Sequence, residues 1–133
     1  MVLTTELLDA LSDKAKSCER LRMNLDLRTS PDDQSQRMLN AMEPGTQLPI
    51  HRHQTTSETI IMLRGSVKEM LYDDRGNLTD SIVLKAGTEP CAMSVPKGVW
   101  HNLECLEPGT ILFEAKDGPF EPRREEDTMT FTI

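Results

Sequence analysis

Aromatic residues and long hydrophobic runs are both scarce in this chain. Aromatic side chains make up 4% of its 133 residues and hydrophobic ones 37%, which suits the core of one domain but leaves apolar surface for a partner subunit to cover. A homodimer is therefore expected. No apolar run approaches the length that spans a bilayer, and residues 1–17 lack the basic start and unbroken apolar stretch of a signal peptide. We expect no membrane partner.

Paired cysteines and an excess of positive charge are missing as well. The three cysteines, Cys18, Cys91 and Cys105, are odd in number and lack a C-x-x-C spacing, which excludes a disulfide framework and a zinc ribbon and favours a cytoplasmic location. With 15 basic and 22 acidic residues the net charge is −7, so a nucleic-acid partner is not expected. Local basic residues can still hold a small anion.

The three histidines are the most informative residues present, because all of them fit one arrangement. His51 and His53 stand two apart, and on a strand such residues point to the same face. Glu58 can add a carboxylate from the next strand. His101 follows the turn Pro96-Lys97-Gly98, which can bring a distant strand back beneath the first pair. The sequence predicts a metal site made of His51, His53, Glu58 and His101.

This ligand set limits the choice of metal. Three imidazole nitrogens and one carboxylate oxygen suit a single divalent first-row transition metal ion, and the candidates are Fe, Mn, Ni, Co, Cu and Zn. Four protein ligands leave open positions for water or substrate on a five- or six-coordinate ion. The ion keeps net positive charge, which attracts an anionic or enolisable small molecule.

The spacing resembles the first motif of the cupin superfamily, Gly-x5-His-x-His-x4-Glu-x6-Gly, at every position from Gly45 to Gly65. The second motif matches in its core, at Pro96, Gly98 and His101. It departs from the pattern where Pro90 stands in place of the leading glycine and Cys105 in place of the closing asparagine.

A narrower resemblance covers nearly the whole chain. The sequence is similar to the WbuC-type cupin-fold metalloproteins, small bacterial proteins often encoded near surface-polysaccharide genes. The matching stretches are residues 37–46, 51–53, 63–65, 100–101, 106–110 and 113–119. The resemblance implies a homodimer and one cupin domain over residues 1–133, with an N-terminal helix and connection over 1–33 and a jelly-roll barrel over 34–133.

The residue pattern itself predicts an all-β jelly roll, a barrel or sandwich, with one short N-terminal α-helix. The helical stripe consists of Leu3, Leu7, Leu8, Leu11 and Ala15, with Thr4 or Thr5 as N-cap. Residues 20–33 are irregular and polar, and we expect a connection there. Eight short strands divided by turn residues follow, which fits a jelly roll: 37–43, 58–63, 67–72, 78–84, 91–95, 101–106, 110–115 and 129–133. The hairpin turn is expected at residues 73–77.

Strand alternation predicts which other residues share the metal cavity. Glu114 and Lys116 lie on one face of their strand, which points either to solvent or into the cavity, where they would serve as an acid/base group and an anion contact. Arg37 and Asn40 are three apart and cannot share a face, and we expect both at the surface. Arg52 should point away from the metal.

Two flanking features are expected to lie outside the cavity. Trp100 should alternate outward into a core or dimer contact. The charged run 123–127 is expected to be a solvated loop.

These residues support three functional hypotheses. The first is a metal-dependent enzyme acting on a sugar or sugar-derived acid, either an isomerase, epimerase or lyase, or a dioxygenase. Glu114 and Lys116 are its candidate catalytic residues. The second is a non-catalytic module that binds a metal or small ligand or has a regulatory role, because cupin barrels host enzymes and binding modules alike. The third is a metal-independent enzyme whose histidines act as acids and bases.

Overall fold

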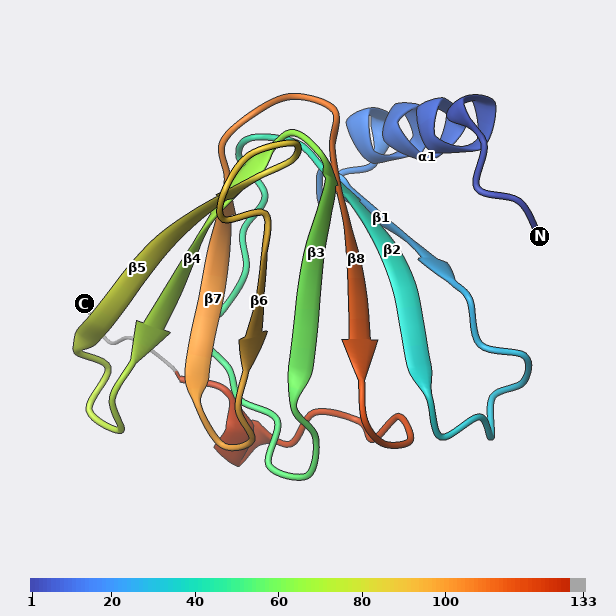
Figure 1. Cartoon of the computed structure of the whole chain (residues 1–133). Coiled ribbons are helices and arrows are strands. Elements are labelled where there is room, and N and C mark those ends of the chain that lie inside the picture. Colours follow the sequence, from blue (N-terminus) through green and yellow to red (C-terminus); the bar gives the residue numbers. More distant parts are fainter. Residues whose placement is uncertain (130–133) are drawn as a thin grey trace.

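The computed structural model describes residues 1–129 and shows two antiparallel β-sheets facing each other with one helix outside (Figure 1). The five-stranded sheet has the order β1-β2-β8-β3-β6 and the three-stranded sheet the order β5-β4-β7. The strands are β1 Arg22–Asp26, β2 Gln36–Met42, β3 Glu58–Arg64, β4 Ser66–Tyr72, β5 Leu78–Lys85, β6 Ala92–Val95, β7 Trp100–Cys105 and β8 Thr110–Lys116. The architecture is the jelly-roll β-sandwich that the sequence predicts.

The main core lies between the two sheets. Strand residues alternate between faces, so Ile60 and Leu112 of the larger sheet point inward toward Val67, Leu84 and other residues of the smaller one. All four side chains are fully buried. Cys105 packs in the same cluster, and burial raises the pKa of its thiol, which fits a small core residue.

Helix α1, Thr5–Ser17, covers part of the outer face of the larger sheet. Thr4 is the N-cap, and its hydroxyl accepts a hydrogen bond from the Leu7 backbone N–H at 3.2 Å. Leu11 and Ala15 of the helix pack on Leu39 and other outward residues. The sandwich therefore has a second, smaller core on its outer side.

Two of the turns between strands depend on a particular residue, Asp73 in one and Gly65 in the other. The Asp73 carboxylate accepts hydrogen bonds at 2.9 Å from the backbone N–H groups of Arg75 and Asn77, and this closes the expected β4–β5 hairpin. Gly65, between β3 and β4, has φ +70°, and a Cβ there would collide with Thr110. The last glycine of the first motif is thus required by the fold.

Two expectations about elements are revised, and a third is not tested. Residues 22–26 form strand β1, paired with β2, so the sheet begins before the expected start of the barrel at residue 34. A short 3-10 helix, η1, occupies Glu125–Asp127 within the expected loop. Most of the strand expected at 129–133 lies outside the described residues. Among residues 1–129 no helix is long and apolar enough to cross a membrane.

Candidate metal centre

The four residues singled out by the histidine spacing come together inside the sandwich. One ligand atom from each of His51, His53, Glu58 and His101 lies within 4.8 Å of every other. The imidazole centroids of His51 and His101 are 4.4 Å apart. Groups this close, three of them with a nitrogen lone pair available, could hold a single transition metal ion.

Three separate segments of the chain carry these four side chains: the segment before β3, β3 itself and β7. Glu58 is the first residue of β3 and His101 the second of β7. His51 and His53 do not lie on a continuous strand as expected. Instead, His51 makes an isolated bridge to His101, with backbone N–H to O distances of 3.0 and 2.8 Å. This bridge fixes the two imidazoles beside each other.

Backbone carbonyls orient two of the imidazoles. The Nδ1 atom of His51 lies 2.9 Å from the Pro49 carbonyl oxygen, and that of His101 lies 2.9 Å from the Val99 carbonyl oxygen. Because a carbonyl only accepts hydrogen bonds, Nδ1 carries the proton in both rings. The lone pair is then on Nε2, which faces the cluster, as metal ligation requires.

The electrostatics of the cluster fit a cation. Glu58 Oε2 lies 3.1 Å from His53 Nε2 and 3.4 Å from His101 Nε2, yet neither nitrogen makes a well-aligned hydrogen bond although both are buried. Burial works to raise the pKa of Glu58, but the two imidazoles outweigh it and hold the pKa well below its usual range. Burial, and then the charge of His101, lowers the pKa of His51 to about 3. His51 is therefore neutral, which is the metal-ligating state of an imidazole. Burial works to lower the pKa of His101, but the hydrogen bond and the charge of Glu58 outweigh it and raise that pKa, so a metal ion would have to displace a proton from His101.

The cluster opens into a cavity of about 240 Å³. Glu114 and Lys116 of β8 line it. Of the two orientations that the sequence allowed for this pair, toward solvent or into the cavity, the structure has the second. Asn40 also lines the cavity, and its side-chain amide donates a 2.8 Å hydrogen bond to Glu114. Burial, and then the charge of Glu58, raises the pKa of Glu114 to about 7. A carboxyl that titrates near neutrality can accept or release a proton there.

Sequence reasoning placed Asn40 at the surface, and this was wrong. The alternation in β2 buries Leu39 and Ala41 beneath the helix, so Asn40 between them faces the cavity. Arg37, three residues earlier, does lie outside the cavity, where it pairs with Asp33 at 2.6 Å. The two residues lie on opposite faces, as their odd separation requires.

Glu69 of β4 is a cavity residue that the sequence did not indicate. Its side chain is fully buried, and neither carboxyl oxygen has a hydrogen-bond partner among the described residues. Burial raises its pKa to about 8, so the group is a neutral acid at neutral pH. The alternation of β4 could have found it, since Glu69 shares a face with Val67, which belongs to the core.

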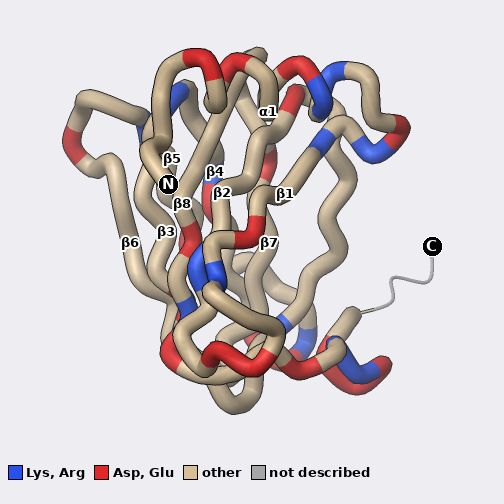
Figure 2. The backbone as a smooth tube through the Cα atoms, turned by 90° about the vertical axis from the view of Figure 1, so that its right-hand side faces the viewer, with Lys and Arg blue, Asp and Glu red and all other residues tan. Residues whose placement is uncertain are grey.

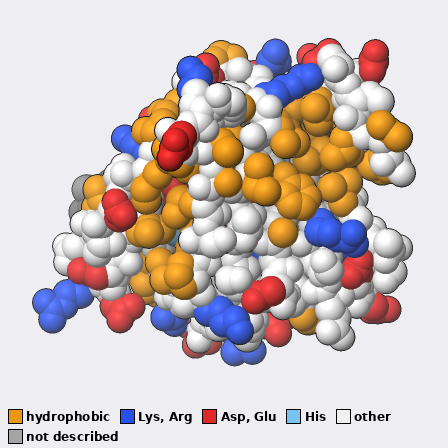
Figure 3. Space-filling view, viewed as in Figure 1, with side chains coloured by type: hydrophobic (Ala, Val, Ile, Leu, Met, Phe, Trp, Pro, Cys, Tyr) orange, Lys and Arg blue, Asp and Glu red, His pale blue; other side chains and the backbone are white. Residues whose placement is uncertain are grey.

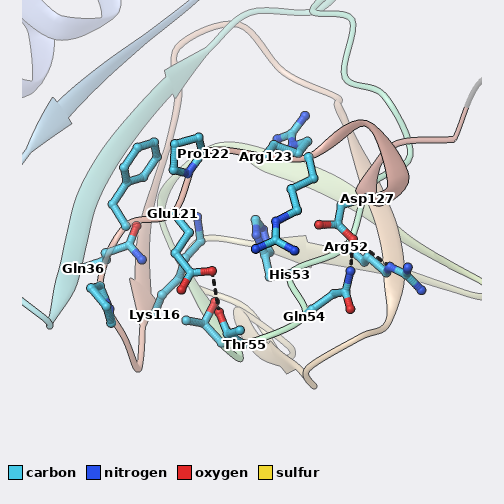
Figure 4. Close-up of a pocket in the computed structure, with 14 residues that line it drawn as sticks. Gln36, Arg52, His53, Gln54, Thr55, Lys116, Glu121, Pro122, Arg123 and Asp127 are labelled. Atoms are coloured by element: carbon cyan, nitrogen blue, oxygen red, sulfur yellow. Dashed lines mark hydrogen bonds and ion pairs between the residues drawn. The ribbon is translucent and has the colours of Figure 1, made fainter.

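A second hollow lies on the solvent side of His53, and Figure 4 shows its lining. There Asp127 accepts hydrogen bonds from Arg52, at 3.0 Å, and from Gln54. The guanidinium of Arg52 lies 4.5 Å from the centre of the Trp100 ring. Arg52 therefore points away from the cluster, as expected, and Trp100 is buried beneath it.

The charged run at residues 123–127 is more than a solvated loop. Asp127 is buried and bound to Arg52, while Arg123 lines both the metal cavity and the second hollow. The signal that could have revealed this role is weak, because a local run of charges carries no information about a contact 75 residues away in sequence.

Comparisons with known proteins agree with the fold. A family model described as "Domain of unknown function (DUF6016)" matches residues 3–84, and no curated protein matches. KdgF from Halomonas sp. matches with a TM-score of 0.58 and 17% identity, over 75% of this chain and 82% of that one. The capsular polysaccharide assembling protein CapF from Staphylococcus aureus gives 0.68 and 19%, over 87% of this chain and 33% of CapF.

Oxalate decarboxylase OxdC from Bacillus subtilis, in a mutant form, gives a TM-score of 0.56 and 20% identity over 73% of this chain and 25% of that one. This chain thus spans about a third of CapF and a quarter of the decarboxylase. These neighbours are cupin-fold proteins, and the likeness shows that the sandwich described above is a cupin fold.

Proposed function

Because the chain belongs to the DUF6016 family, a domain of unknown function, its activity has to be argued from the site, and we propose a metal-dependent enzyme acting on a small polar metabolite. The observation that supports this most is the convergence of three imidazoles and one carboxylate in a cavity that also holds Glu114 and Lys116. The four convergent residues would be the ligands, and the latter two would contact the substrate.

The residues beside the cluster suit proton transfer. Asn40 orients the Glu114 carboxyl through their 2.8 Å hydrogen bond, and a pKa of about 7 lets that carboxyl take a proton from carbon or oxygen and return it. Lys116 places a positive charge beside it, where an anionic group of the substrate can be held. A divalent ion held by the four ligands would supply a Lewis acid, or an oxygen-binding centre if redox-active.

A sugar-derived acid is the substrate class we propose. The cavity, at about 240 Å³, is below the usual range for drug-sized ligands and suits a monosaccharide-sized molecule. The resemblance to WbuC-type proteins supports a link to surface polysaccharides, and one structural neighbour is named as a capsular polysaccharide assembling protein. Isomerisation, epimerisation or elimination is distinguished from oxygenation by whether substrate turnover consumes oxygen.

The first experiment is elemental analysis of protein purified without a metal-affinity tag. We expect about one equivalent of a transition metal in the wild type and a loss of it in His101→Ala. Glu104→Gln, an exposed carboxylate on the same strand as His101, is the matched control and should retain the metal. Metal content that is unchanged in His101→Ala would contradict the proposed ligand set. The metal-loaded protein is then incubated with sugar acids, and turnover is followed by NMR and an oxygen electrode.

A homodimer and a cytoplasmic location complete the proposal. Ile61 and Leu63 on the outer face of β3 are 38% and 40% exposed, and Figure 3 shows hydrophobic side chains gathered below α1 on this side of the molecule. A second subunit could cover them. Sedimentation equilibrium showing only a monomer at micromolar concentration would contradict the dimer.

The state of the cysteines supports the cytoplasmic location. All three are free, as is usual in a reducing compartment.

A further inference from the structure

Three arginines surround the solvent side of the metal cavity. Arg20 lies in the turn after α1, Arg22 begins β1, and Arg123 lies in the segment before η1. All three line the same cavity as the buried histidines, but Arg20 and Arg123 are exposed and Arg22 is half-buried. We call these three residues the arginine cluster. It lies at the entrance, with the metal ligands behind it.

The cluster has no acidic partner among residues 1–129. Of the six other arginines, all but the exposed Arg75 pair with a carboxylate within 4.0 Å: Arg28, Arg37, Arg52, Arg64 and Arg124. None of the ion pairs in the described part of the chain includes a member of the cluster. In a protein with 22 acidic residues, three neighbouring guanidinium groups without a carboxylate leave their charge available for a ligand.

The three groups are close enough to act on one another. Burial, followed by the charges of Arg20 and Arg123, lowers the pKa of Arg22. All three guanidinium groups line the cavity that His51 also lines, so the cluster and the proposed metal ligands share one cavity. Arg22 is held in place by a 3.0 Å hydrogen bond from its guanidinium to the Gln47 carbonyl oxygen. Positive groups that are held together in this way are stabilised by a bound anion.

Edge strand β1 is what brings the cluster to the cavity. Arg22 pairs with Met42 of β2, and Asn24 pairs with Asn40. Residues 22 and 24 therefore share the face that lines the cavity, whereas Met23 and Leu25 pack toward the helix. The alternation turns Arg22 toward the cavity, and Arg20, in the turn before β1, lines the same cavity.

We infer that the cavity takes a phosphorylated sugar acid, whose carboxylate end reaches the metal centre and whose phosphate monoester binds the cluster of Arg20, Arg22 and Arg123. This inference rests on the proposed function and specifies its substrate class. Guanidinium groups bind phosphate oxygens through paired N–H donors, and three positive charges match a phosphate dianion better than a single carboxylate. Lys116, which also lines the cavity and pairs with the strand position of Glu58, remains for the acid end.

The rest of the molecule argues against a long anionic polymer as the ligand. The net charge is −7, and Figure 2 shows acidic positions distributed over both ends of the sandwich. A polyanion extending beyond the cavity would be repelled there. A small ligand whose charge ends at the cluster avoids this repulsion.

Calorimetric titrations with three compounds test the two ends of the proposed ligand separately. Gluconate carries only the acid end, inorganic phosphate only the phosphate, and 6-phosphogluconate carries both. With metal-loaded protein we expect 6-phosphogluconate to bind at least about tenfold more tightly than gluconate, a difference of about 1.4 kcal/mol. The preference should fall as salt is raised. Chelator-treated protein should still bind inorganic phosphate, because the cluster does not need the metal.

Arg123→Gln and Arg20→Gln are the variants of choice, since both side chains are exposed and their loss should not affect folding. Each should remove most of the tenfold preference while leaving metal content and gluconate affinity unchanged. Arg75→Gln, in the distant β4–β5 hairpin, removes the same charge and should retain the preference. Equal affinity for gluconate and 6-phosphogluconate, or a preference that survives in both cluster variants, would overturn the inference. A missing metal together with cluster-dependent phosphate binding would instead refute the proposed metal chemistry.

Discussion

Lys116 lies directly opposite Glu58 where β8 pairs with β3. Both side chains point into the cavity, and the pairing register also sets Glu114 opposite Ile60 on the same face. The carboxylate proposed to bind metal and the carboxyl proposed to transfer a proton are therefore neighbours, with a lysine beside both. Glu58 raises the pKa of Glu114 and Lys116 lowers it, which gives a direct test of this arrangement.

Lys116→Gln should raise the pKa of Glu114 above its value of about 7, because the charge that favours the ionised carboxyl is removed. Carboxyl carbon shifts followed by NMR across pH 5 to 9 measure this in chelator-treated protein. Lys14→Gln, on an exposed part of α1, should leave the titration unchanged. A Glu114 pKa that falls or stays constant in Lys116→Gln would show that the two side chains do not interact.

The buried carboxyl of Glu69 should make stability depend on pH. Its folded-state pKa is about 8, above that of an unfolded glutamate near 4.3. The folded chain therefore holds a proton that the unfolded chain has lost between these values. Stability is greatest below the unfolded pKa and is lost as the pH rises through the folded one, by up to about 1.4 kcal/mol per pH unit.

Glu69→Gln cannot ionise and should lack this dependence. Urea denaturation of metal-free protein at pH 5, 6.5 and 8 measures the free energy of unfolding. Between pH 5 and pH 8 this free energy should rise in the variant, relative to the wild type, by on the order of 2 to 4 kcal/mol. Glu104→Gln, an exposed control, should follow the wild type. Parallel stability curves for Glu69→Gln and the wild type would refute the raised pKa.

Leu39 tests the packing of the helix on the sheet. Leu39 belongs to β2, and its side chain is fully buried between the larger sheet and α1, so Leu39→Ala should lower the free energy of unfolding by about 2 to 5 kcal/mol through lost burial and a cavity. Leu78→Ala, at a position that is 56% exposed, should change it by less than about 0.5 kcal/mol. Chemical denaturation monitored by circular dichroism gives both values, and equal losses would mean that α1 does not cover this face.

Asp127 tests the outer support of the metal centre. It accepts hydrogen bonds from Arg52 and Gln54, the residues on either side of His53. Asp127→Asn weakens the attachment of this segment, and we expect metal affinity to fall by about tenfold, as for other supports of ligand side chains. Competition with a chromogenic chelator measures it. The neighbouring Glu126→Gln, which alters an exposed pair with Arg124, should bind metal as the wild type does.

Several features of this protein follow from the sequence without reference to tertiary structure. The spacing of His51, His53, Glu58 and His101 identified the four residues that converge, because metal ligation constrains which residue types can stand at which separations. Alternation identified most strands and their two faces, and Asp73 with its turn located the β4–β5 hairpin. These signals are local, or depend on residues too rare to coincide by chance.

Other features were decided only when distant segments met. Residues 22–26 are polar enough to read as a loop, and they become a strand because β2 offers a free edge to pair with. Asn40 and Glu69 face the cavity because the opposite faces of their strands pack elsewhere. The arginine cluster joins residues about 100 positions apart, Arg22 and Arg123. A sequence pattern shows which side of a strand a residue takes, but the neighbour across from it depends on how the whole chain folds.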